Sequence, residues 1–183
     1  LATDDGAITA VWHEYDEATF RTVMLVRHRD PSGTWSPPGQ LTVDSSSWVV
    51  SSLDQDGGTR LSYLNRIPDT EDTELVTRQL SPDGDLGEPV RVDGPLPITG
   101  FRLDGAVADD GSSLLRWYAD TGTDPVQERL YRCLPVGGCT SVGDQGAVES
   151  LMAVTPTGAA LIVSNDGIEG CRASRLCSRR LPP

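Results

Sequence analysis

The sequence predicts an all-β protein, and two observations lead to this prediction. Turn glycines recur at positions 6, 57, 111 and 158, in steps of 51, 54 and 47 residues. Each turn is followed by a short run rich in β-branched, aromatic and leucine residues, and no stretch has the i, i+3, i+4 spacing of a long helix. A period of about fifty residues filled with short strands predicts four-stranded antiparallel blades, stacked as in a β-propeller.

The strands are expected in the same order in every repeat. A first, innermost strand precedes the turn glycine, at 48–53, 101–108 and 148–154. A second strand follows the turn, at 8–12, 60–64, 113–117 and 159–163. A third follows a polar loop, at 22–28, 74–80, 127–133 and about 172–177, and a fourth lies at 34–43, 86–92 and 139–142. Prolines 37, 38 and 89 place the fourth strand at the outer edge, because proline cannot donate a ladder hydrogen bond.

These strands group into four units, approximately 1–46, 47–97, 98–147 and 148–183, with 3, 4, 4 and 3 strands. The first unit is expected to lack its innermost strand and the last its outermost. Open sheet edges are costly and prone to aggregation. We therefore expect the chain to be part of a larger propeller, completed by a companion polypeptide. A compact β-sandwich is the alternative.

Composition limits the classes of function. The chain of 183 residues has 27 acidic and 15 basic residues and a net charge of −12, which argues against a nucleic-acid partner. No apolar run approaches the length of a membrane span. No charged-then-apolar leader opens the sequence, so we expect any signal peptide to have been removed.

Two segments carry a resemblance to a known family. An Asp-Gly turn leading into a strand that ends in Trp12, and a second strand that runs through Gly33 into Trp35-Ser-Pro-Pro, resemble the repeats of secreted bacterial β-propellers. These are the sialidase-like or BNR-like repeat proteins common in actinobacteria. The resemblance implies a secreted, extracellular propeller that binds glycans or other proteins.

Three residues are candidates for ligand binding: Trp35, Arg66 and Tyr118. Trp35 follows a turn at an outer edge, where an exposed ring can stack on a sugar. Arg66-Ile-Pro resembles the arginine element with which sialidases hold a sugar carboxylate, although acidic residues follow it. Tyr118 opens a loop beside Trp117. Trp12 and Trp117 occupy matching strand positions and are expected to be buried between neighbouring sheets.

Metal and catalytic sites are weakly indicated. Asp69, Glu71 and Asp72 form the best candidate site for a cofactor, a calcium ion, and a solvated loop is the alternative. His13 and His28 are the two histidines, and we expect surface roles for both. No nucleophile motif accompanies them, so no catalytic residue is assigned.

The sequence contains four cysteines. Cys133 and Cys139 flank a predicted turn, so we expect them to form a disulfide in an oxidising compartment. Cys171 and Cys177 have the same spacing but fall on one predicted strand, where they would be roughly 20 Å apart. Either that strand breaks at 172–174, or one partner lies elsewhere.

The sequence therefore predicts a secreted, non-enzymatic binding module that presents propeller loops to a glycan or protein. A glycoside hydrolase or lyase of propeller architecture is the alternative, and it would need two carboxylates or a Tyr–Glu pair in one pocket.

Overall fold

A computed structural model describes the backbone of residues 1–3, 6–18, 20–43, 49–53, 57–70, 72–97, 100–122, 126–145, 151–154, 160–164, 167–171 and 178–180, and side chains only as far as position 142. The described residues form strands and turns without a helix, so the predicted all-β class is confirmed. None of them belongs to a helix that is long and apolar enough to cross a membrane.

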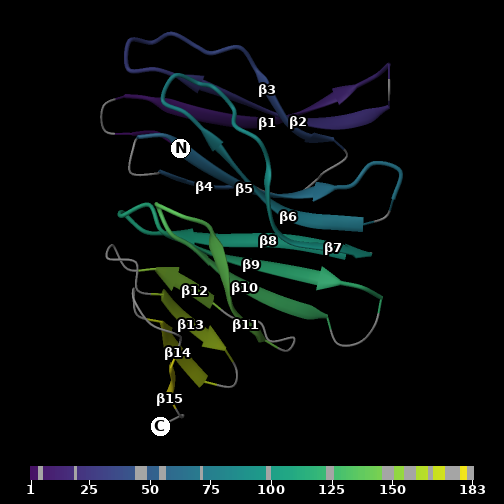
Figure 1. Ribbon diagram of the computed structural model, residues 1–183, viewed down its shortest axis with the longest axis vertical. Helices are drawn as coiled ribbons and strands as arrows, with labels where there is room; N and C mark the ends of the chain where they lie inside the picture. Colours follow the sequence, from purple (N-terminus) through teal and green to yellow (C-terminus); the bar gives the residue numbers. More distant parts are fainter. Residues whose placement is uncertain are drawn as a thin grey trace. The chain divides into compact units, whose positions relative to one another are not determined.

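The strands follow one another in four antiparallel sheets (Figure 1). They are β1 (Ile8–Asp16), β2 (Arg21–Arg29), β3 (Gly39–Val43), β4 (Val50–Leu53), β5 (Thr59–Arg66), β6 (Asp72–Leu80), β7 (Val90–Pro97), β8 (Gly100–Val107), β9 (Ser113–Asp120), β10 (Gln127–Cys133), β11 (Cys139–Gln145), β12 (Leu151–Val154), β13 (Ala160–Ser164), β14 (Gly167–Cys171) and β15 (Ser178–Arg180).

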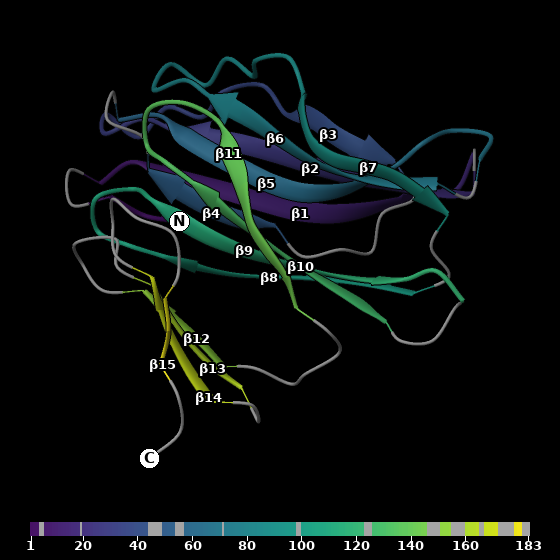
Figure 2. The same ribbon diagram turned by 60° about the horizontal axis from the view of Figure 1, so that its bottom comes forward.

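Within each sheet the strands lie in sequence order. The first sheet is β1-β2-β3, the second β4-β5-β6-β7, the third β8-β9-β10-β11 and the fourth β12-β13-β14-β15. Every sheet therefore falls inside one of the four units expected from the sequence. Figure 2 shows this meander clearly in the third sheet, where β9 lies between β8 and β10.

The last repeat differs from the sequence prediction. Its third strand is β14 (Gly167–Cys171), and the range 172–177, where the sequence predicted that strand, lies outside the described residues. A fourth strand, β15, pairs with β14, so the expected count of three strands was wrong. The count was wrong because the short runs that form β14 and β15 each carry few apolar residues and were not recognised as strands. Cys177 and any bond from it lie outside the described residues.

The two compact bodies of the chain are Leu1–Ser51 with Asp56–Pro97, and Ser52–Gln55 with Ile98–Pro183. In the first body, the first and second sheets share one apolar core, formed by Met24, Val26, Leu41, Leu61, Tyr63, Val76 and Leu80. Polar contacts join the same sheets. The hydroxyls of Thr9 and Thr59 are 3.0 Å apart, and Nη1 of Arg78 donates to the carbonyl of Gln40 at 2.9 Å.

In the second body, the third sheet has its own buried residues, among which Trp117 is fully buried. Leu103 lies opposite Trp117 on β8, and the guanidinium of Arg129 lies 6.0 Å from the centre of its ring. The predicted burial of Trp117 is thus confirmed. Trp12, the equivalent residue of the first sheet, is only half-buried, so the prediction was wrong in degree for that ring.

The turn between third and fourth strands is built alike in three repeats. Gly33, Gly84 and Gly137 adopt φ values of 95°, 88° and 106°, each two positions after a proline. The residues flanking this turn pair across it as Arg29 with Trp35, Leu80 with Leu86, and Cys133 with Cys139. In the third sheet the pair is covalent.

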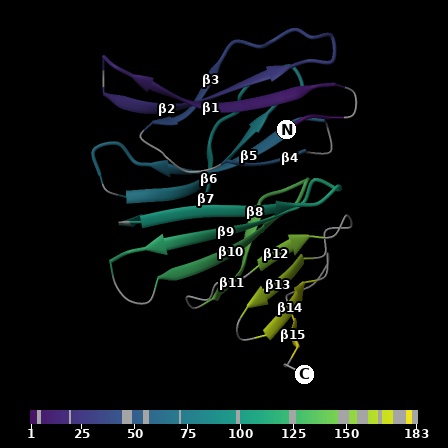
Figure 3. The same cartoon turned by 180° about the vertical axis from the view of Figure 1, so that it is seen from behind.

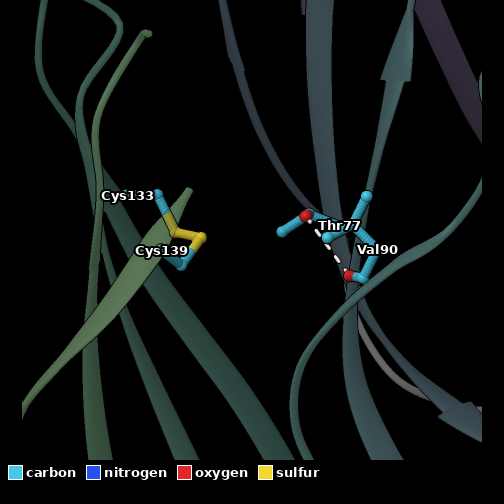
Figure 4. The surroundings of a disulfide bond; sticks show 4 residues. All are labelled: Thr77, Val90, Cys133 and Cys139. Carbon is cyan, nitrogen blue, oxygen red and sulfur yellow. Dashed lines mark hydrogen bonds between the residues drawn. A yellow bond between two sulfur atoms is a disulfide. The ribbon is translucent and has the colours of Figure 1, made fainter. Parts of the chain in front are cut away.

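The predicted disulfide between Cys133 and Cys139 is confirmed (Figure 4). Their Cα atoms are 4.0 Å apart because the two residues face each other as β10 ends and β11 begins. A disulfide of this kind indicates an oxidising environment.

Candidate functional site

Trp35 is held by a turn with a dense set of hydrogen bonds. Gly33 N donates to the carbonyl of Asp30 at 3.0 Å, and Asp30 N donates to the carbonyl of Thr34 at 2.9 Å. The Asp30 carboxylate also accepts from Ser32 Oγ at 2.6 Å and from Thr34 N at 2.8 Å. These bonds lower the pKa of Asp30, because each stabilises the charged carboxylate, and the bond from Ser32 has the largest effect. The turn is therefore fixed in one conformation just before Trp35.

The ring of Trp35 lies beside a cation and remains accessible. The guanidinium of Arg27 sits 5.5 Å from the ring centre, and Arg27 Nε donates to the carbonyl of Ser36 at 2.8 Å. Trp35 is 40% exposed. The site therefore presents an oriented indole, with a cation–π contact that restrains its rotation.

Tyr118 lies in a network of charged side chains on the third sheet. The strand register places Arg102, Tyr118 and Glu128 side by side, with Asp104 and Arg116 forming the next pair along. Arg116 Nη2 and Asp104 Oδ2 are 2.8 Å apart, and Arg102 Nε and Asp104 Oδ1 are 2.9 Å apart. Arg116 Nη1 lies 4.0 Å from Glu128 Oε1. Two arginines and two carboxylates thus balance in charge, and this network gives little net attraction for an anion.

The network also fixes the phenol of Tyr118. The guanidinium of Arg116 lies 4.8 Å from the ring centre and that of Arg102 lies 5.9 Å from it. Burial, followed by the negative charge of Glu128, raises the pKa of Tyr118. At neutral pH the side chain is therefore a protonated hydrogen-bond donor and a poor nucleophile.

Arg66 is the last residue of β5 and is exposed. The loop after it bonds to itself: Ile67 N donates to the carbonyl of Asp72 at 2.9 Å, and Asp72 N donates to Thr70 Oγ1 at 3.1 Å. Asp69 is exposed, with a φ of 62°. Glu71 lies outside the described residues, and among the described ones no three His, Cys, Asp or Glu side chains converge as metal ligands would.

Trp35 and Arg66 are not brought together. Trp35 pairs with Arg29, which lies opposite Ile8 at the start of β1, and the neighbouring Thr9 bonds to Thr59 at the start of β5. Arg66 is seven residues after Thr59 on β5, so the rise of an extended strand places it about 23 Å from Thr59. Tyr118 belongs to the other compact body.

The two histidines occupy different environments. His13 is exposed on β1, as expected. His28 is buried, with Nδ1 3.4 Å from Thr9 Oγ1 and its backbone N–H donating to Ser36 Oγ at 3.0 Å. The expected surface role of His28 was wrong, because its side chain points toward the second sheet beside Thr9.

A scan of the sequence against protein-family models finds no match, and a search among curated proteins finds none either.

The network around Tyr118 was missed in the sequence. Arg116 interrupts the apolar run Leu114-Leu115-Arg116-Trp117, which was the available signal. A charged residue inside such a run requires a partner if it is buried. Finding that partner requires the register between β8 and β9, which the sequence pattern alone leaves open.

Proposed function

We propose that this protein is a secreted, non-enzymatic binding module of β-propeller architecture, and that the ring of Trp35 contacts a glycan. Support for the architecture comes from four successive antiparallel meanders with a repeat of about fifty residues. The disulfide supports an extracellular location, because such bonds persist in oxidising compartments.

The exposure of Trp35 is the observation that carries the glycan proposal. The equivalent residue of the second sheet, Leu86, is partly buried against the core of the first body, and that of the third sheet, Cys139, is bonded to Cys133. Trp35 instead leaves 40% of its surface accessible, in a chain where aromatic residues make up 5%. A fixed, accessible indole offers an apolar face to the C–H groups of a sugar ring.

Charge favours a neutral sugar over an acidic one. The chain carries a net charge of −12, which raises the cost of approach for an anionic glycan. The guanidinium of Arg27 lies 5.5 Å from the ring centre, and its Nε is already bonded to the carbonyl of Ser36. We therefore expect neutral hexose-containing glycans to bind best.

The test is a glycan array probed with the chain and two variants. Trp35→Leu installs the residue that occupies the equivalent position in the second sheet, so it keeps apolar packing and removes the aromatic face. Leu86→Trp is the matched control, because it places an indole at the equivalent position of the second sheet and leaves Trp35 unchanged. We expect wild-type binding to fall at least tenfold in Trp35→Leu. Equal binding by Trp35→Leu would refute the role of this ring.

One observation favours the alternative of a glycoside hydrolase. Tyr118 lies directly opposite Glu128 across β9 and β10, with Asp104 in the same network. The raised pKa of Tyr118 opposes a nucleophilic role. Turnover of an artificial glycoside, abolished in both Tyr118→Phe and Glu128→Gln but retained in Trp35→Leu, would establish this alternative.

A further inference from the structure

The turn between the third and fourth strands is stabilised differently in the third sheet than in the first two. In those two sheets, the residue that opens the turn caps it with a side-chain oxygen. Asp30 Oδ1 accepts from Thr34 N at 2.8 Å, and Ser81 Oγ accepts from Asp85 N at 3.0 Å. The equivalent residue of the third turn is Leu134, whose side chain has no hydrogen-bond acceptor. The third turn is therefore built without this side-chain cap.

The strand after the third turn also has less apolar burial to hold it. In the first sheet, Leu41 of β3 belongs to the core of the first body, and in the second sheet Leu86 packs against that core shortly before β7. The side chains described for β11 are those at 139–142, and none of these four is buried. β11 is the last strand of the third sheet, beside β10 (Figure 3). At its start, the covalent bond to Cys133 takes the place of apolar burial.

A bulge separates the start of β11 from the rest of its ladder. Three pairs lie next to the turn, from Cys133 with Cys139 to Tyr131 with Ser141. The register then shifts between Tyr131 and Leu130, and a bulge of this kind locally disrupts the ladder. The first three residues of β11 thus form a short unit, with the disulfide at one end and the bulge at the other.

The disulfide can be approached from the side of Cys139. Cys133 is fully buried, whereas Cys139 is partly exposed. Gly137 and Gly138 come just before Cys139, and a Cβ built on either glycine meets nothing within 4 Å. An incoming thiolate therefore has open space next to this half of the bond.

We propose that the bond between Cys133 and Cys139 is a redox-sensitive switch that holds or releases the start of β11. One thiolate of a dithiol attacks Sγ of Cys139, forms a mixed disulfide with it and displaces Cys133 as a thiolate. The second thiol of the reductant then attacks its own sulfur in the mixed disulfide and displaces Cys139, so that the dithiol leaves as a disulfide. The dithiol loses two electrons and two protons, and each cysteine gains one of each.

The consequence of this reaction is local. Once the covalent bond is broken, residues 139–141 separate from β10, because neither a capped turn nor buried side chains hold them there. The first two turns stay closed, since their caps and their buried residues are independent of any disulfide. The third sheet therefore has a complete fourth strand in an oxidising compartment and a loosened one in the presence of a dithiol. This inference stands independently of the glycan proposal.

Amide hydrogen exchange with and without dithiothreitol gives the first test. The full chain carries Cys171→Ser and Cys177→Ser, so that the bond being reduced is the one in the third sheet. The amides compared are those of the residue after each cross-turn pair: Ser36, Gly87 and Thr140. We expect Thr140 to exchange at least tenfold faster after reduction, while Ser36 and Gly87 are unchanged and reoxidation restores slow exchange.

Two results would overturn the proposal. Unchanged exchange at Thr140 in fully reduced protein would show that the bond does not hold β11. Equal acceleration at all three amides would show that the bond supports the whole fold and not one segment.

Restoring the missing cap gives the second test. In Leu134→Asp, the new carboxylate can accept from Gly138 N, as Asp30 accepts from Thr34 N in the first sheet. Leu134→Ala is the matched control, because it removes the same side chain without adding an acceptor. After reduction, the amide of Thr140 should exchange several-fold more slowly in Leu134→Asp than in Leu134→Ala. Equal exchange in the two reduced variants would refute the role of the missing cap, and with it the switch.

Discussion

Alanine substitutions at Gly111 and Gly57 test how closely neighbouring backbone approaches the turn that contains Gly111. Both glycines lie in the turn that precedes the second strand of their repeat, and both have a φ of 79°. A Cβ built on Gly57 meets nothing within 4 Å. A Cβ built on Gly111 would collide with the backbone carbonyl oxygen of Leu53 and lie 3.6 Å from Cβ of Pro135. The two sites therefore share the strain of a left-handed residue and differ in available space.

We expect Gly57→Ala to lower the free energy of unfolding by about 1–2 kcal/mol, the cost of placing a side chain in the left-handed region. Gly111→Ala should carry that cost and a further 1–3 kcal/mol or so, because an overpacked site has to displace its neighbours. The obstacle at Gly111 is backbone, which cannot rotate away as a side chain would. The total for Gly111→Ala is thus about 2–5 kcal/mol.

The assay is urea denaturation of the wild type and both variants, followed by tryptophan fluorescence. The difference between the two variants is the decisive quantity, since the shared φ strain cancels. Unchanged m-values would show that stability alone has altered. If the two substitutions agree within about 0.5 kcal/mol, the contact with Leu53 is not a determinant of stability and the reasoning fails.

Trp117→Ala should cost about 3–5 kcal/mol, as expected for a fully buried aromatic residue, and a loss under about 1 kcal/mol in denaturation would contradict its burial. Folding raises the pKa of Tyr118. The phenol therefore contributes its full share of stability below about pH 10, and that share is lost as the pH rises through the folded pKa. Above about pH 10, the free energy of unfolding should thus fall less steeply with pH in Tyr118→Phe than in the wild type. Cys171 and Cys177 should be bonded, because they have the same sequence spacing as the bonded pair Cys133 and Cys139; non-reducing peptide mapping that finds either one free would disprove it.

Strand positions were predictable because the turn chemistry repeats. An Asp-Gly or Pro-x-Gly turn, followed by an apolar run, sets the start of a strand by local constraints alone. This logic located the start of β9 at Ser113 and the start of β11 at Cys139. It missed β14, which lies at Gly167–Cys171, where no strand was predicted.

Burial was less predictable than strand position. Trp12 and Trp117 have the same place in their repeats, yet their exposure differs: Trp117 has β8 beside it, whereas among the described strands β1, which carries Trp12, pairs with β2 alone. His28 reads as an exposed strand residue, but its environment depends on Thr9 and Ser36, which reach it from other parts of the chain. Properties of this kind depend on register and on neighbouring sheets, which a single sequence does not contain.

One position in the repeat shows how function can arise on such a scaffold. The residue after the third-strand turn is Trp35 in the first sheet, Leu86 in the second and Cys139 in the third, and each pairs with the end of the preceding strand. The turn needs only some pairing at this place, since an Arg–Trp pair, a Leu–Leu pair and a disulfide all occupy it. Folding therefore does not require one particular side chain at this position. A position with that freedom can acquire an exposed aromatic ring at little cost in stability, which is why Trp35, and not the fully buried Trp117, is the tryptophan that we assign to ligand binding.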